Sequence, residues 1–154
     1  MEILKIGLIS GIVGHAVNMW CDRALSITPN GKLSVSTMND INDPQKMAEL
    51  YEGVNPSVPM NSAVLGAFAL FLQYFGCASI AFYIGRCSNI LGVILFVCAS
   101  LFVIVGAGHH VKYALSVWMF IKGGRDEKSY ELLPDYIMEE APQSHVILDI
   151  LVIS

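Results

Sequence analysis

The sequence predicts an all-α, multi-pass transmembrane helical bundle, and two observations carry this prediction. Residues 89–120 form a run of 32 positions with a single formal charge, Lys112, and residues 3–20 and 63–84 form two more long apolar runs. A membrane span needs about 20 mostly apolar residues, and continuous runs of this kind satisfy their backbone as helices. Only 14% of the residues are charged and the mean hydropathy is +0.58, whereas soluble domains carry about 25% charged residues.

The first span is expected at about residues 3–23. Its apolar core is short enough for a signal peptide, but Glu2 and Lys5 make a weak basic start. No small-residue cleavage site follows Val17, so we interpret the segment as a retained helix.

A polar connection at residues 24–60 follows, with a turn predicted at Pro29-Asn30-Gly31. Asp43-Pro44 is typical of a helix start, with aspartate as N-cap and proline at the first helical position. The apolar side chains of this short helix fall on one side, which predicts an amphipathic helix at the bundle end or membrane surface. These side chains are Met47, Leu50 and Tyr51.

The next two spans are expected at about residues 61–85 and 90–121. Only residues 86–89 separate them, so they are predicted to form an antiparallel hairpin. A helix over the 32-residue run would be about 48 Å long, too long for one upright span. It is therefore tilted, extends past the bilayer, or is broken near residues 106–108.

The rest of the chain is predicted to hold an acidic connection at residues 122–142 and the start of a fourth helix at 145–154. Ten residues cannot cross the bilayer, so this would be a partial fourth span. A chain ending in mid-span leaves carbonyl groups unsatisfied in lipid. We therefore expect residues 1–154 to form one membrane domain that is incomplete at its C-terminus.

Small residues predict how the three spans pack. On a helical wheel, Gly11 and Gly14 share an arc of about 100° with the polar residues of the first span. The second span carries a seam of mostly small residues spaced four, three, four and three apart, which suits close left-handed packing. The helix-packing residues are predicted to be Gly11, Gly14, Gly66, Ala69 and Gly106.

Polar residues of the first and third spans are expected to meet at one end of the bundle. Counting 1.5 Å per residue places Asp22 about 28 Å and His110 about 30 Å from the same side. Ionisable residues inside a membrane are functional candidates by default. The candidate cluster is His15, Asn18, Asp22, His110 and Lys112. The alternative is that Asp22, His109 and Lys112 mark helix ends at the headgroups and His15 is a packed core histidine.

Several function classes are excluded by the sequence. There is no basic stripe for nucleic acid, no metal-binding histidine spacing and no hydrolase or nucleotide-loop signature. We therefore predict no metal and no cofactor. The expected partners are a lipid bilayer, a small-molecule or lipid ligand, and a second copy of the chain.

Three hypotheses of function remain open. The first is a small-ligand-binding or transporter-like membrane protein. The second is a membrane-embedded enzyme acting on a lipid or sterol, with His15 or His110 as acid–base group and Asp22 as its orienter. The third is a structural subunit without a site.

The distribution of basic residues predicts an orientation. Lys5 and Arg86 fall on one side of the membrane and six basic residues on the other, which places both long connections in the cytoplasm and the N-terminus outside. Those six are Arg23, Lys32, Lys46, Lys122, Arg125 and Lys128.

The motifs Gly11-Ile12-Val13-Gly14-His15 and Cys21-Asp22-Arg23-Ala24-Leu25, followed by Pro29-Asn30-Gly31, cover the first span and its exit. This stretch resembles a family of uncharacterised multi-pass membrane proteins. The resemblance implies a longer helical bundle and transfers no catalytic residue.

Overall fold

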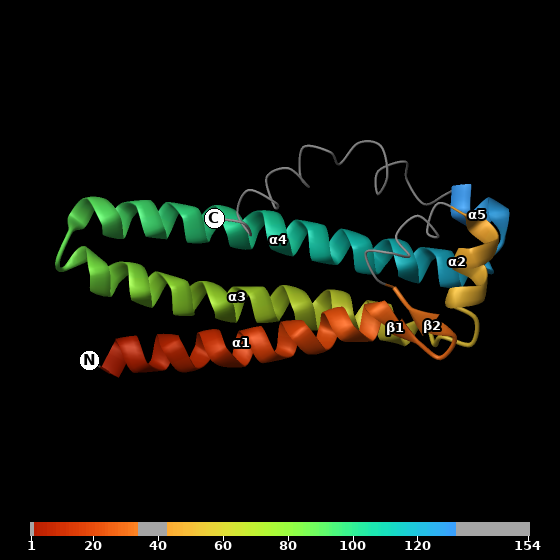
Figure 1. Cartoon of the computed structure of the whole chain (residues 1–154), viewed down its shortest axis with the longest axis horizontal. Helices are drawn as coiled ribbons and strands as arrows, with labels where there is room; N and C mark the ends of the chain where they lie inside the picture. Colours follow the sequence, from red (N-terminus) through yellow and green to blue (C-terminus); the bar gives the residue numbers. More distant parts are fainter. Residues whose placement is uncertain (1, 34–42, 132–154) are drawn as a thin grey trace.

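Three long helices run side by side along the length of the molecule (Figure 1). They are α1 (Glu2–Ser26), α3 (Ser57–Gly85) and α4 (Asn89–Gly123) in a computed structural model that describes residues 2–33 and 43–131. All three are long and apolar enough to cross a membrane. The expected helices at 3–23, 61–85 and 90–121 are therefore present, each with additional residues at one or both ends. The predicted fourth helix at 145–154 lies outside the described residues.

The chain direction alternates, so that α4 runs parallel to α1 and α3 lies between them (Figure 1). The link between α3 and α4 is only three residues, and the Ser88 hydroxyl begins α4 by accepting a hydrogen bond from the Leu91 amide at 3.4 Å. Of the three alternatives for the long run, the break is ruled out, because α4 continues unbroken through residues 106–108. Its 35 residues make a helix about 53 Å long.

The first connection closes one end of the bundle with a hairpin and a short helix. Strands β1 (Ile27–Thr28) and β2 (Gly31–Lys32) pair antiparallel around the expected turn, with Thr28 opposite Gly31. This small β element is an addition that the sequence did not predict, in a described structure that is otherwise helical. Its cause is local, because a two-residue loop brings the two strands into hydrogen-bonding register.

Helix α2 (Pro44–Leu50) forms as the Asp43-Pro44 motif predicts. The Asp43 carboxylate accepts hydrogen bonds from the amides of Gln45 at 3.0 Å and Lys46 at 3.4 Å. Its apolar side packs on the end of α4, as expected for an amphipathic helix. Met47 and Tyr51 are buried against Val117, Phe120 and Ile121, and Leu50 packs against the same cluster at its edge.

Residues beyond α4 hold α2 in this position. The Arg125 guanidinium donates to the carbonyl oxygens of Tyr51 at 2.9 Å and Val54 at 2.7 Å. These carbonyls follow the last turn of α2, where backbone acceptors lack helical partners. The short helix α5 (Glu127–Glu131) lies beside α2 at the same end (Figure 1).

Helices α1 and α3 meet almost backbone to backbone. A Cβ atom added to Gly11 would lie 3.0 Å from Gly76 Cα, and one added to Gly14 would lie 2.8 Å from the backbone nitrogen of Gln73. Ala69 is fully buried at the same interface. Glycine is required here because any side chain would push the helices apart.

Gly106 does not make the close helix contact that we expected. A Cβ atom there would meet only the Leu70 side chain, at 3.9 Å. The glycine contact between the backbones of α3 and α4 lies near their shared turn instead, where a Cβ on Gly92 would lie 2.6 Å from Gly85 Cα.

Candidate functional site

His110 lies between α3 and α4, in a space that Gly66 leaves open. A Cβ atom on Gly66 would collide with the imidazole ring, so glycine at this position is what admits a histidine into the interface. The ring is only 8% exposed. A buried imidazole needs hydrogen-bond partners, and neighbouring helices supply one for each nitrogen.

Both ring nitrogens of His110 face acceptor oxygens. Nδ1 lies 3.0 Å from Asp22 Oδ1 on α1, and Nε2 lies 3.0 Å from the carbonyl oxygen of Ser62 on α3. A neutral imidazole has one N–H, whereas an imidazolium has two. The arrangement therefore fits a charged imidazolium that donates to both oxygens, with the Asp22 carboxylate as its counter-charge.

Asp22 is the open member of the pair. Its side chain is 53% exposed, and its second oxygen accepts a hydrogen bond from the Asn18 amide nitrogen at 2.9 Å. Two of the carboxylate's four or so acceptor positions are thus used. The remaining positions are available to a donor or cation that approaches from outside the bundle.

Ser62 connects the pair to the α1–α3 interface. Its hydroxyl donates to the Cys21 carbonyl oxygen at 3.1 Å and lies 3.5 Å from His110 Nε2. One residue of each long helix is thereby joined in a single polar network of Asp22, Ser62 and His110. The sequence analysis missed Ser62 as a polar partner; its position four residues before Gly66, at the start of the seam of small residues, is the signal that could have found it.

A second polar contact lies nearby, where α2 covers the bundle end. The Tyr51 hydroxyl donates to the Leu25 carbonyl oxygen at 3.3 Å and lies 3.3 Å from the Tyr113 hydroxyl. Burial raises the pKa of the Tyr51 phenol well above its ordinary value, so this side chain stays a neutral hydrogen-bonding group. The sequence placed Tyr51 inward but did not indicate this partner, which lies three residues after His110.

His15 is not part of the network. It lies on an exposed face of α1, because the buried side of that helix is centred on Gly7, Gly14 and Cys21. His15 follows Gly14 directly and so points about 100° away from it. The wheel placed His15 at the edge of the inward arc, and the observed packing turns that edge outward.

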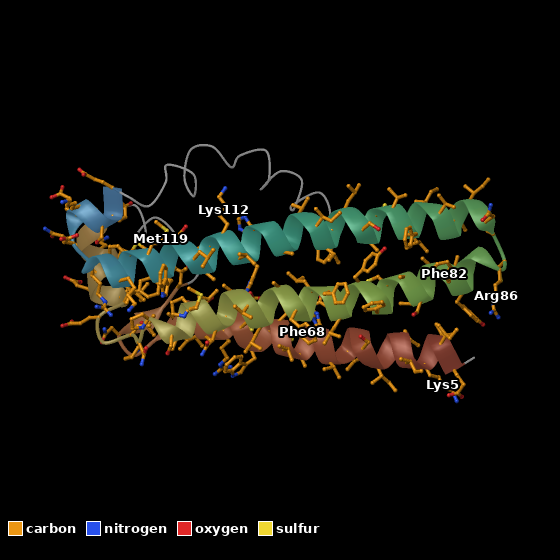
Figure 2. The ribbon with its side chains drawn as sticks, turned by 180° about the vertical axis from the view of Figure 1, so that it is seen from behind. Lys5, Phe68, Phe82, Arg86, Lys112 and Met119 are labelled. Carbon is orange, nitrogen blue, oxygen red and sulfur yellow. The ribbon has the colours of Figure 1, made fainter. Side chains whose placement is uncertain are left out.

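Lys112 also points elsewhere. Figure 2 shows its side chain directed away from α3. Residues two positions apart on a helix point about 200° apart. Because His110 is buried against α3, Lys112 is turned to the opposite side of α4. The structure therefore brings Asn18, Asp22 and His110 together, without His15 and Lys112.

The described network has hydrogen-bonding chemistry, and it lacks the three or more converging side-chain ligands of a transition-metal site. Within residues 2–33 and 43–131, no group of three or more His, Cys, Asp or Glu side chains converges. An additional acceptor is present, because Asn18 Oδ1 is buried and has no hydrogen-bond partner in the described part of the chain.

Residues 1–153 match DUF6796, a family of unknown function. The chain belongs to this family. No curated protein and no solved structure matches the chain. The membership is consistent with the expected resemblance to uncharacterised proteins, and it assigns no residue of the DUF6796 chain a role.

Proposed function

We propose that this protein is a membrane protein that binds a small cation at Asp22 in exchange for a proton held by His110, in the manner of a transporter. The cation class comprises monovalent alkali-metal ions and small organic ammonium ions, which one carboxylate can pair with and which need no group of three fixed side-chain ligands. The observation that carries the proposal is the ion pair between the half-exposed Asp22 carboxylate and the buried His110 ring.

The exchange follows from charge balance at the pair. His110 Nδ1 lies 3.0 Å from Asp22 Oδ1. A cation that binds the Asp22 carboxylate therefore repels the imidazolium and neutralises the carboxylate that was its counter-charge. His110 then releases its Nδ1 proton, and its remaining Nε2 proton still donates to the Ser62 carbonyl oxygen. One positive charge enters as one leaves, so the site stays neutral, which suits a low-dielectric environment where isolated charges are costly.

The enzyme hypothesis has less support from the same geometry. A general acid or base must come within about 2.6–3.2 Å of the substrate proton. The His110 ring is 8% exposed and both nitrogens already contact oxygens. His15 is exposed but lies outside the network, so it lacks the orienting carboxylate that the enzyme hypothesis required.

The test is proton release on addition of cations. The protein in weakly buffered detergent solution is mixed with Na⁺, K⁺, ammonium, methylammonium or choline, and a pH-sensitive dye reports released protons. We expect up to one proton per chain for the recognised cation. Asp22→Asn should abolish the release, because the amide keeps the shape of the carboxylate without its charge.

The matched control is Asp126→Asn, since Asp126 is an exposed carboxylate on the segment before α5. This variant should release protons as the unaltered chain does. Equal proton release from Asp22→Asn and from the unaltered chain would refute the proposal. The absence of proton release with every cation would refute it too. Proteoliposomes containing the dye then distinguish transport from binding alone, because only transport acidifies or alkalises the lumen.

A further inference from the structure

The α3–α4 hairpin contains a cavity at the end of the bundle opposite to Asp22 and His110. Its volume is about 430 Å³, within the range of about 300–1,000 Å³ typical of small-molecule pockets. Gly85 and Gly92 line it and bring the two backbones into contact. Because these positions have no side chains, the larger residues on either side form walls around an open space.

The walls of the cavity are apolar and aromatic. Phe82 and Phe96 line it from the two helices, with ring centroids 5.9 Å apart, and Val93 lies beside them. Phe82 is 72% exposed and Val93 is 55% exposed. The lining therefore continues into the apolar outer surface of α3 and α4, which is where lipid chains would lie around a membrane-spanning hairpin.

Two polar side chains, Arg86 and Asn89, line the same cavity. Arg86 lies at the turn of the hairpin, near Phe82 (Figure 2). No hydrogen bond or ion pair engages its guanidinium within residues 2–33 and 43–131. The other cation at this end, Lys5, already pairs with Glu2 at 3.9 Å. The cavity thus combines an apolar lining with one uncompensated positive charge.

We propose that this cavity binds an anionic glycerophospholipid. The lipid phosphate lies against the Arg86 guanidinium, the Asn89 amide donates to a headgroup oxygen, and one acyl chain lies along the exposed side chains of Phe82 and Val93. Arginine matches a phosphate through paired N–H donors in a planar fork. The hairpin turn places this arginine at the end of two spans, at the depth of the headgroups.

The experiment is native mass spectrometry of the detergent-solubilised protein titrated with phosphatidylglycerol or phosphatidylcholine. We expect a first phosphatidylglycerol adduct that persists at higher collision energy than the phosphatidylcholine adduct. Arg86→Gln should weaken the phosphatidylglycerol adduct about tenfold or more, as expected for loss of a charge-assisted contact. Lys5→Gln is the matched control, since it removes a cation from the same end outside the cavity lining, and it should leave the affinity unchanged.

A cavity-filling variant tests the acyl-chain part separately. Val93→Trp places a large ring at an exposed wall position and should weaken the adducts of both lipids. Inorganic phosphate at millimolar concentration should not displace phosphatidylglycerol, because it lacks the acyl chain. Equal weakening by Arg86→Gln and Lys5→Gln, unchanged binding in Val93→Trp, or displacement by free phosphate would each overturn the proposal.

Discussion

Replacing Gly66 with alanine places a methyl group against the His110 ring. The added Cβ would overlap the ring atoms Nε2 and Cδ2 and would lie 2.8 Å from Cε1, whereas carbon atoms pack at about 3.5–4.0 Å. The ring must therefore withdraw from α3 by more than about 0.7 Å. The contact between Nε2 and the Ser62 carbonyl oxygen, now 3.0 Å, would lengthen past the hydrogen-bonding limit of about 3.2 Å.

The cost of this substitution can be worked from its parts. Overpacking costs about 1–3 kcal/mol, and loss of a hydrogen bond from a charged donor costs about 1.5–3 kcal/mol. Replacing glycine by alanine within a helix stabilises the folded state by about 0.5–1 kcal/mol, because alanine loses less backbone entropy on folding. We therefore expect Gly66→Ala to lower the free energy of unfolding by about 2–5 kcal/mol.

The assay is reversible unfolding by sodium dodecyl sulfate in mixed micelles, followed by circular dichroism. Gly108→Ala is the control, because nothing lies within 4 Å of a Cβ atom at that position, and it should be neutral or slightly stabilising. The double variant Gly66→Ala/His110→Ala should be no less stable than His110→Ala alone. Additive costs, or a Gly66→Ala variant as stable as the control, would refute the argument that Gly66 acts through His110.

Three further predictions follow from contacts elsewhere in the structure. Gly11→Leu should prevent stable packing of α1 on α3, whereas Gly106→Leu should be tolerated, as compared by thermal stability in detergent. Arg125→Ala should detach α2 by removing two hydrogen bonds to backbone carbonyls, at a cost of about 1.5–3 kcal/mol, and should speed amide exchange around Tyr51. Hydrogen bonds from Ser129 hold the pKa of Asp126 below its usual range. The Asp126 carboxylate caps α5 by accepting from the Ser129 amide at 2.7 Å. The protection of the α5 amides should therefore be complete above the ordinary aspartate pKa and be lost as the pH falls through the lower folded-state pKa of Asp126. Unchanged α5 amide signals over that pH range would argue against this cap.

The long helices and the capped helix α2 were predictable because their signals are local. Apolar runs give the spans, and Asp43-Pro44 marks a helix start whatever surrounds it. Depth counting also brought Asp22 and His110 to the same end, since helical rise depends little on packing. The contact of 3.0 Å between them depended on a further condition, the open space at Gly66.

The remaining features depend on how the helices are rotated against one another. A wheel shows which residues share an arc, but the partner helix decides where in that arc the contact is centred. A difference of one residue separates buried Gly14 from exposed His15. The sequence could not indicate the Ser62 carbonyl oxygen as a partner of His110 either. In a regular helix that oxygen accepts a hydrogen bond from the backbone amide four residues later.

At Gly11 and Gly76, α1 and α3 meet through backbone with no side chain between them, and this bears on how the two helices keep their register. A shift by one turn, about 5.4 Å, would move Gly7 to the place of Gly11 and so preserve much of the smooth surface. Two hydroxyl groups oppose such sliding, because Ser10 donates to the Leu72 carbonyl oxygen at 3.2 Å and Ser62 donates to that of Cys21 at 3.1 Å. The two contacts come from opposite helices and lie about three turns apart along α1, so together they fix the lengthwise position of α1 on α3.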